Sequence, residues 1–329
     1  MKKKKIENIL ITGGAGYIGS HIAKQLERSY KIYIIDNLSN GYKKLIIKNS
    51  KFLRGDINNF DLNFNFLKKN NIDTVIHCAG LLNVEESMTK KNLYFQNNVN
   101  GTKVLLEAMR KNKIQNFIFS STCSVYGKVK FTVSEKNKTK PISNYGKTKL
   151  KCENLIKKYY NKGYLKNCAI LRFFNVAGSN YKNNLGQIKD NGQLIKNLCL
   201  TKKKKQKNFF IYGNNYKTKD GTCIRDYIHV MDLAGIHYEI LKKFNKISFF
   251  KILNCGYGKG SSVKEIVSNF QKISKYKLNI VYKPRRAGDP PEVVSNIKLL
   301  NSFLKFKPKF NSLKKIIYSS YKWEERKSK

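Results

Sequence analysis

The amino-acid sequence predicts an α/β fold, with a doubly wound parallel sheet followed by a smaller, mixed α/β domain toward the C-terminus. Three observations predict it. Apolar runs of strand length alternate with helix-length periodic segments through the first half of the chain, a glycine-rich turn follows the first apolar run, and the alternation weakens after Asn175. No segment of about 20–50 residues repeats, which excludes a solenoid.

The strand candidates are short apolar runs, most of which end in small or polar residues. In chain order they cover residues 8–14, 31–37, 51–57, 74–80, 116–122 and 168–176. Helical periodicity occupies the segments between them, most clearly at 17–29, 101–112 and 144–160. A polar, asparagine-rich stretch at 177–192, a short strand at 209–214 and a tail of shorter elements follow. This order predicts a helix-covered parallel sheet first and mixed structure after it.

The composition indicates a globular chain with surface charge in excess. Of 329 residues 41% are hydrophobic, and the net charge is +45. No apolar run approaches the roughly 20 residues of a membrane helix, so we expect no membrane partner. Lysine far outnumbers arginine and is spread along the whole chain with abundant asparagine and isoleucine. That spread indicates compositional bias and solvated surface, and we expect no specific nucleic-acid partner.

The number and spacing of the cysteines and histidines argue against disulfide bonds and metal sites. Seven scattered cysteines form no C-x-x-C pair and four histidines are dispersed, so the sequence predicts neither a disulfide framework nor a metal site. The basic start is followed by a short apolar stretch that runs into a glycine turn, which is typical of a first strand and not of a signal peptide. We expect a cytoplasmic protein.

The turn after the first strand reads LITGGAGYIGSH and spaces Gly13, Gly16 and Gly19 three apart at the start of a helix. This pattern gives a tight turn, lets the backbone approach a pyrophosphate, and presents the N–H groups of a helix N-terminus, which here begins at Tyr17 and Ile18. It predicts a Rossmann-type dinucleotide-binding domain.

Polar strand ends complete the predicted cofactor site. Asp36 ends the next strand, where a carboxylate accepts hydrogen bonds from an adenosine ribose and repels a 2′-phosphate, so NAD is favoured over NADP. The carboxyl ends of the neighbouring strands face the same crevice. The further candidates at these ends are Asn37, Asp56, Ile57, Ala79 and Gly80.

A Tyr-x-x-x-Lys spacing occurs at Tyr126/Lys130, Tyr145/Lys149, Tyr238/Lys242 and Tyr318/Lys322, which is no more than chance provides in so lysine-rich a chain. Only Tyr145/Lys149 begins a helix after a strand that ends in a hydroxyl, that of Thr122. One helical turn places Lys149 on the face of Tyr145, where its ammonium, with a positive nicotinamide ring nearby, is expected to lower the pKa of the phenol. We interpret these three residues as catalytic and the other pairs as chance.

Ten segments then follow one another along the chain: TGGAGYIGSH, DNLSNG, GDI, VIHCAG, NNVNGT, FIFSST, YGKTK, RFFNVAG, DGTCIRDYIHVMDLA and PRRAGDPPE. In order and spacing they resemble the UDP-glucose (UDP-galactose) 4-epimerase family of extended short-chain dehydrogenases/reductases, from residue 6 to about 325. The resemblance implies a homodimer paired through helices such as 98–112 and 145–160, with the UDP-sugar in a cleft. It implies an NAD domain of residues 1–175 plus about 226–256, and a UDP-sugar domain of about 176–225 and 257–329.

The resemblance also implies roles. Tyr145 takes the proton of the sugar 4-hydroxyl, Lys149 holds the nicotinamide ribose, and Asn97 lies near the nicotinamide. Hydride leaves C4 for NAD, the 4-keto sugar turns over, and hydride returns to the opposite face, which requires firm nucleotide contacts and loose hexose contacts. The positions matched to UDP-sugar binding are Asn175, Gln193, Tyr212, Arg225, Arg286, Asp289 and Val293.

Three positions depart from the family pattern. Leu82 stands where some members have a lysine that contacts the cofactor, and Gln193 replaces an asparagine often seen beside the sugar. Val293 occupies a site where glucose-restricted members carry a tyrosine. A smaller side chain leaves room for an N-acetyl group, so we hypothesise that UDP-GlcNAc and UDP-GalNAc are also substrates.

Rival functions remain at this point. A nucleotide-sugar dehydratase or decarboxylase needs an extra acid after Thr122, where this chain has Cys123 and Ser124. A UDP-glucuronate 4-epimerase stays open. From another class, a non-catalytic NAD-binding or RNA-associated protein is opposed by the intact Thr122, Tyr145 and Lys149.

Overall fold

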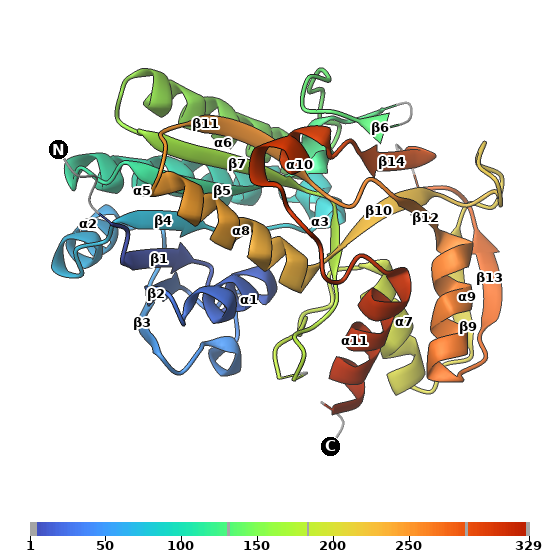
Figure 1. The fold of residues 1–329 in the computed structure, drawn as a ribbon. Helices are drawn as coiled ribbons and strands as arrows, with labels where there is room; N and C mark the ends of the chain where they lie inside the picture. Colours follow the sequence, from blue (N-terminus) through green and yellow to red (C-terminus); the bar gives the residue numbers. More distant parts are fainter. Residues whose placement is uncertain (1–4, 130–131, 183, 287–288, 327–329) are drawn as a thin grey trace. The chain divides into compact units, whose positions relative to one another are not determined.

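The computed structural model describes residues 5–129, 132–182, 184–286 and 289–326 (Figure 1). The chain forms two compact units, and each is described by itself. Unit 1 consists of Met1–Gly127, Thr139–Arg172 and Ala234–Leu253, and unit 2 of Lys128–Lys138, Phe173–Leu233 and Asn254–Lys329.

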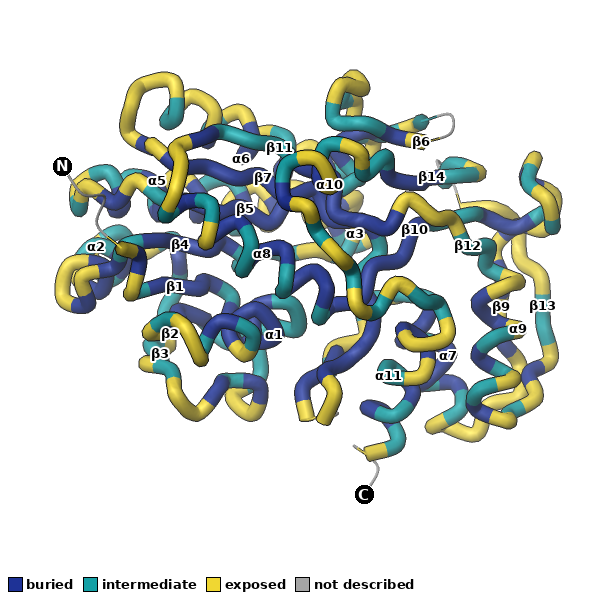
Figure 2. The backbone as a smooth tube through the Cα atoms, in the orientation of Figure 1, coloured by how far each residue is buried: buried dark blue, intermediate teal, exposed yellow. Residues whose placement is uncertain are grey.

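A seven-stranded sheet with the order β11-β7-β5-β4-β1-β2-β3 forms the centre of unit 1. The pairings of β1 with β2 and β4, of β2 with β3 and of β4 with β5 are parallel. β4 and β7 are buried at every residue (Figure 2), which explains why these segments are continuously apolar. The strands are β1 Asn8–Thr12, β2 Lys31–Asp36, β3 Ser50–Arg54, β4 Thr74–His77, β5 Asn116–Thr122, β7 Asn167–Phe173 and β11 Phe250–Cys255.

Helices cover both faces of this sheet. α2 (Phe60–Lys69), α5 (Gly101–Lys111) and α6 (Asn144–Asn161) enclose one core cluster, in which Leu105 and Ile156 of the helices join Leu10, Val75 and Phe117 of the strands. α1 (Tyr17–Leu26) and α8 (Val230–Phe244) lie on the opposite face (Figure 1). The predicted α/β fold with a doubly wound parallel sheet is confirmed. Shorter elements are η1 Lys43–Leu45, α3 Val84–Thr89, α4 Lys91–Tyr94, the π-helix η2 Phe95–Asn100 and η3 Cys123–Val125.

Unit 2 is mixed. β12, β10, β14 and β6 form one sheet, in which β12 runs antiparallel and β14 parallel to β10, and β8 also pairs with β10. β9 and β13 form a parallel pair, while α7, α9 and α11 pack on one another. The strands are β6 Thr132–Val133, β8 Asn175–Ala177, β9 Asn208–Tyr212, β10 Ile224–His229, β12 Gly260–Ser262, β13 Asn279–Lys283 and β14 Glu292–Ser295. The helices are α7 Leu194–Lys203, α9 Val263–Ser274, α10 Lys298–Leu304 and α11 Leu313–Arg326.

The chain passes between the units more often than the sequence pattern indicated. Lys128–Lys138 belongs to unit 2 because Thr132 and Val133 of β6 pair with β14. The segment that returns to unit 1 is Ala234–Leu253, where we expected about 226–256. A two-residue strand carries no periodic pattern, so this crossing has no signal in the sequence.

Candidate active site

The turn between β1 and α1 depends on glycine at two places. Gly13 has φ +72°, and a Cβ atom there would lie 2.6 Å from the backbone nitrogen of Ala79. A Cβ on Gly19 would collide with the Gly13 carbonyl oxygen. Gly16 donates its N–H to that oxygen at 3.1 Å and caps α1 without a side-chain bond. The turn therefore brings the start of α1, at Tyr17 and Ile18, close to the carboxyl end of β1, as pyrophosphate binding requires.

Asp36 is fixed at the end of β2 by backbone donors. Its Oδ2 accepts the N–H of Ala15 at 3.0 Å, and its Oδ1 accepts the N–H of Leu38 at 2.8 Å. Burial raises the pKa of the carboxyl, and the two hydrogen bonds partly offset that rise. The carboxylate is thus held against the glycine turn, where a ribose-binding group is predicted.

Asn37 and Asp56 meet where β2 and β3 end. The Asn37 amide donates to Asp56 Oδ2 at 2.9 Å, and Asn58 donates to Oδ1 through its backbone N–H at 2.8 Å. Burial raises the pKa of Asp56, but the hydrogen bonds outweigh it and the pKa stands below its ordinary value. The side chain of Ile57 instead is buried against Gly101, where a Cβ would lie 2.6 Å from its Cδ1.

The loop after β4 links the glycine turn to the predicted catalytic lysine. A Cβ on Gly80 would lie 3.4 Å from Lys149 Nζ and 3.2 Å from Asn98 Oδ1. Asn98 holds this loop, because its Oδ1 accepts the N–H of Leu81 at 2.8 Å and its amide donates to Leu81 O at 3.0 Å. Asn98, which the sequence did not single out, is the neighbour of the predicted Asn97, which is half-buried and donates to Asn98 Oδ1 at 3.0 Å. Both residues lie in the π-helix η2, and the sequence carries no pattern that indicates a π-helix here.

The predicted tyrosine and lysine lie on α6, as expected. Ser143 caps the helix by accepting the N–H of Gly146 at 3.0 Å, and Ser87 of α3 accepts the N–H of Tyr145 at 3.1 Å. Lys149 Nζ donates to the carbonyl of Ser120 at 2.9 Å and lies 4.8 Å from the ring centroid of Phe119. The structure therefore brings Lys149 to the end of β5, the strand that Thr122 closes.

The surroundings of this pair shift both pKa values. Burial raises the pKa of Tyr145 above its ordinary value because it removes the water that would solvate a phenolate, and a hydrogen bond with Thr122 lowers it only in part. Burial also lowers the pKa of Lys149, while the nearby Cys152, Cys78 and Glu153 raise it. The expected lowering of the tyrosine pKa by Lys149 and a bound nicotinamide stays a prediction.

The remaining Tyr-x-x-x-Lys pairs have other surroundings. Lys130 lies outside the described residues. Lys242 lies 5.5 Å from the ring centroid of Tyr238 on α8, and Lys322 lies 5.8 Å from that of Tyr318 on α11, so each is a cation–π pair within one helix. Among the residues that the structure describes, no group of histidine, cysteine and acidic side chains is arranged to hold a metal ion.

Two residues of unit 2 that were matched to UDP-sugar binding form an ion pair with each other. Arg225 of β10 contacts Asp289 Oδ1 through Nη2, and the same nitrogen donates to the carbonyl of Pro290 at 2.8 Å. β10 and β14 pair in register, which places Val293 opposite Arg225. Val293 is 9% exposed. The structure thus brings together Arg225, Asp289 and Val293, which are up to 68 residues apart in sequence.

Tyr212 and Arg286 also meet. The guanidinium of Arg286 lies 4.3 Å from the ring centroid of Tyr212, which ends β9 and is 43% exposed. Asn175 on β8 forms a side-chain hydrogen bond with Tyr227 on β10. Ala287 and Gly288, which belong to the last family motif, lie outside the described residues. The aromatic–arginine pair supplies a stacking surface and a positive charge at the end of a strand.

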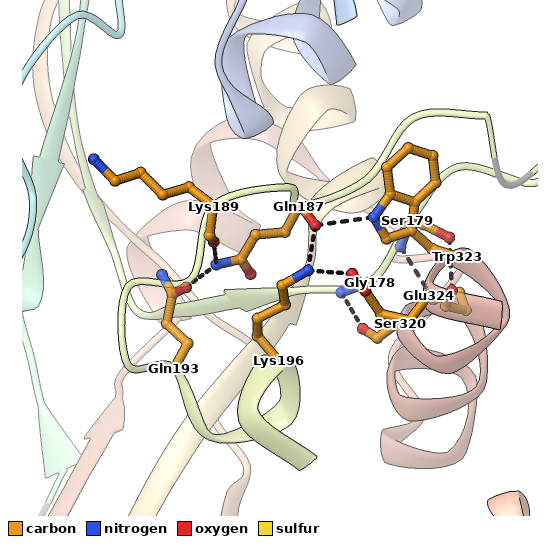
Figure 3. Close-up of polar contacts among 10 residues, drawn as sticks. Gly178, Ser179, Gln187, Lys189, Gln193, Lys196, Ser320, Trp323 and Glu324 are labelled. Atoms are coloured by element: carbon orange, nitrogen blue, oxygen red, sulfur yellow. Dashed lines mark hydrogen bonds and ion pairs between the residues drawn. The ribbon is translucent and has the colours of Figure 1, made fainter. Parts of the chain in front are cut away.

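Gln193 lies in a separate network at the start of α7 (Figure 3). Its side-chain oxygen accepts from the amide of Gln187, which also donates to the carbonyl of Lys189 at 3.1 Å. The Gln187 carbonyl in turn accepts from Trp323 Nε1 at 2.9 Å and from Lys196 Nζ at 2.8 Å. Lys196 is ion-paired with Glu324, and both side chains are buried. No described contact joins Gln193 to the other predicted substrate residues.

Comparison with known proteins decides the family. Residues 9–256 match the NAD dependent epimerase/dehydratase family. The chain belongs to this family. The UDP-glucose 4-epimerase of Halalkalibacterium halodurans is 34% identical to this chain over 320 residues, which cover 96% of this chain and 95% of the relative. The UDP-glucose 4-epimerase of Azospirillum brasilense is 36% identical over 319 residues, covering 96% and 91% of the two chains.

Solved structures of family members agree with this assignment. The UDP-glucose 4-epimerase of Brucella ovis in complex with NAD is 35% identical, with a TM-score of 0.92 over 96% of this chain and 98% of that one. The UDP-Glc/GlcNAc 4-epimerase of Campylobacter jejuni is 35% identical, with a TM-score of 0.85 over 97% and 99%. Among the residues that the structure of this chain describes, no helix is both long enough and apolar enough to cross a bilayer.

Proposed function

We propose that this chain is an NAD-dependent UDP-glucose 4-epimerase that interconverts UDP-glucose and UDP-galactose. One observation carries the proposal: the Ala79–Gly80 loop lies between Gly13 of the dinucleotide turn and Lys149 of the catalytic helix. A dinucleotide seated on the turn therefore extends toward Tyr145 and Lys149. Kinship with UDP-glucose 4-epimerases along nearly the whole chain supports the same reaction.

The residues present fit NAD. The backbone at Gly13 and Gly19 leaves no room for a Cβ atom, and the start of α1 supplies N–H groups for the pyrophosphate. Asp36 receives the adenosine ribose, and Lys149 and Asn97 receive the nicotinamide end. When bound, NAD would act as the oxidant that takes a hydride from C4 and gives it back, and its positive charge would favour the phenolate of Tyr145.

Tyr145 moves the proton in both half-reactions. It accepts the proton of the 4-hydroxyl during oxidation and returns it during reduction, with Thr122 bridging the phenol and the sugar hydroxyl. Because burial raises its pKa, the tyrosine is a phenol at neutral pH in the structure and needs a favourable charge to ionise. Lys149, held by the Ser120 carbonyl, supplies a nearby ammonium. Between the two half-reactions the 4-keto sugar rotates, so that hydride returns to its opposite face and the configuration at C4 is inverted.

Unit 2 contributes the UDP-binding residues. Arg225 and Arg286 suit the diphosphate because a guanidinium is a fork donor for phosphate oxygens. Tyr212, beneath Arg286, borders the uracil, and Asp289 and Asn175 complete the nucleotide grip. Gln193 and Val293 border the hexose. The firm charged contacts thus go to UDP and the neutral ones to the sugar, as a rotating hexose requires.

A coupled assay of the purified protein tests the proposal. UDP-galactose is converted to UDP-glucose, and the product is followed with a UDP-glucose dehydrogenase that reduces added NAD. We expect turnover without any net consumption of the cofactor bound to the epimerase. Parallel reactions with UDP-glucuronate and UDP-arabinose, in which the epimeric products are separated by chromatography, distinguish the proposal from other 4-epimerases, because a relative 35% identical is a UDP-arabinose 4-epimerase of Arabidopsis thaliana. Turnover confined to one of those sugars would refute glucose/galactose specificity.

We propose further that N-acetylated UDP-sugars are substrates. Val293 lies opposite Arg225. If this position borders the hexose, as the family resemblance implies, its small side chain leaves room for an N-acetyl group. A solved relative 35% identical is a UDP-Glc/GlcNAc 4-epimerase, which supports the idea. The test is conversion of UDP-GlcNAc by the unmodified protein, and absence of conversion at saturating substrate would overturn the proposal.

We infer a homodimer and a cytoplasmic location. Four apolar side chains of α3, α4 and η2 are exposed, namely Val84, Met88, Leu93 and Phe95 at 46%, 56%, 50% and 38%. Such a patch is typical of an interface, and a second copy that covers it with α5 and α6 would remove it from water. Light scattering is expected to give twice the chain mass for the wild type and the mass of one chain for Met88→Lys/Leu93→Lys. A wild-type monomer would refute the dimer.

The cysteines support the cytoplasmic location. All seven are free thiols, which suits a reducing compartment.

A further inference from the structure

The last three residues of β5 each bond to α6. The carbonyl of Ser120 accepts from Lys149 Nζ at 2.9 Å, and Ser121 Oγ donates to Glu153 Oε1 at 2.5 Å. The side chain of Thr122 is hydrogen-bonded to Tyr145. The three helical partners are four residues apart and so lie on one face of α6, one turn after another. Two of these contacts involve predicted catalytic residues, and the third, to Glu153, does not.

Glu153 is held in turn by a buried arginine. Arg172, on the neighbouring strand β7, donates from Nε to Oε1 at 3.0 Å and from Nη2 to Oε2 at 2.6 Å. The side chains are 4% and 3% exposed, and the guanidinium carbon lies 4.8 Å from the ring centroid of Tyr126. Two parallel hydrogen bonds fix the direction of a carboxylate as well as its distance. Glu153 therefore ties α6 to two adjacent strands at once.

We propose that Glu153 and Arg172 are positioning residues for catalysis, which set the register of α6 against the end of β5 and so the places of Tyr145 and Lys149. This inference rests on the proposed epimerase function. Glu153 acts through Ser121 and through the helical turn that it shares with Lys149. Arg172 acts by orienting the carboxylate of Glu153 through two parallel hydrogen bonds.

The same carboxylate supports the charge of Lys149. The groups that face the lysine are His77 of β4, Cys78 after β4, and Cys152 and Glu153 of α6. Burial lowers the pKa of His77 to about 3 and raises the pKa of both thiols, so these three groups are neutral at pH 7. Glu153 is the anion of the set, and its charge raises the pKa of Lys149 against the lowering caused by burial.

Glu153→Gln tests the inference, because it keeps the shape and one of the two acceptor oxygens but removes the charge. We expect kcat with UDP-galactose to fall by about tenfold to a hundredfold with KM unchanged, since substrate contacts lie elsewhere. Loss of the anion lowers the pKa of Lys149 further, so the alkaline limb of the kcat–pH profile is expected to move to lower pH. An unchanged kcat and an unmoved limb in a folded, NAD-containing variant would overturn the proposal.

Two further variants keep the test decisive. Ser121→Ala cuts the link from Glu153 to β5 but leaves the buried ion pair intact, so it disturbs the buried charges less than Glu153→Gln, and it is expected to lower kcat at constant KM. An unaltered kcat in Ser121→Ala would count against the proposal. Lys196→Met/Glu324→Met removes the buried ion pair of unit 2 as a matched control and leaves the alkaline limb in place. A limb that moves equally in the control would show a general structural effect and refute positioning. Inactive wild-type protein would refute the epimerase function itself, before any variant is compared.

Discussion

The predicted site residues of the two units differ in what they bond to. In unit 1 they bond mainly to backbone or to neighbours that hold them in place: Asp36 accepts from two N–H groups and Lys149 donates to a carbonyl. In unit 2 four of them form two pairs, since Arg225 is ion-paired with Asp289 and Arg286 lies on Tyr212. The predicted cofactor residues are therefore preorganised, whereas a diphosphate that binds Arg225 as proposed would have to compete with Asp289. Variants in unit 1 should change kcat, and variants in unit 2 should change KM or stability.

The largest effect is expected from the buried ion pair of unit 2. Lys196→Met leaves Glu324 charged and buried without its cation, which should lower the free energy of unfolding by about 3–5 kcal/mol. The double variant Lys196→Met/Glu324→Met should recover most of that loss, because two apolar side chains need no partner. Urea unfolding followed by tryptophan fluorescence measures both, since Trp323 lies beside Glu324 on α11. Equal losses in the single and double variants would contradict the account of this pair.

Lys149 tests the unit 1 side of the comparison. Lys149→Met removes the ammonium near the reacting phenol, and kcat should fall by about a hundredfold to a thousandfold. NAD retention is expected to weaken as well, because the same side chain is proposed to hold the nicotinamide ribose. Steady-state kinetics with added NAD separates the two effects. If saturating NAD restored kcat fully, Lys149 would act only in cofactor binding and not in the chemical step.

Arg225 is the counterpart in unit 2. Arg225→Met should raise KM for UDP-galactose by about tenfold to a hundredfold and change kcat little, because a charged hydrogen bond to phosphate is made equally in the ground and transition states. Arg225→Lys is the matched control: it keeps the charge but not the fork, and an intermediate KM is expected. A fall in kcat at constant KM would mean that Arg225 acts in the chemical step, and would contradict the expected difference between the two units.

Val293→Tyr should give the smallest change. The added ring is expected to lower kcat/KM for UDP-GlcNAc by about tenfold relative to UDP-glucose, because it fills space beside the hexose. Val293→Ala controls for loss of packing at this 9% exposed position and should leave the selectivity ratio unchanged. Equal losses for both sugars in Val293→Tyr would indicate overpacking of β14 in place of a steric filter.

The sequence predicted local features well and long-range pairs poorly. The strand cores and α6 follow from apolar runs and helical periodicity, and the glycine turn follows from its spacing. Asn98 was missed because a π-helix has no periodic pattern of its own. The pairing of Glu153 with Arg172, 19 residues apart, and of Arg225 with Asp289, 64 apart, depends on how strands and helices pack. The burial that raises the pKa of Tyr145 has no signal in the sequence either, because burial is set by the whole fold.

The central claim is that Tyr145 carries the proton of an epimerisation that uses bound NAD. The most direct test is Tyr145→Phe beside the wild type in one assay with UDP-galactose, with bound NAD quantified in both proteins. We predict that the wild type forms UDP-glucose, and that the variant retains NAD and loses turnover by about a hundredfold or more, since the phenylalanine ring has no proton to exchange. Unchanged turnover in a variant that holds NAD would contradict the account.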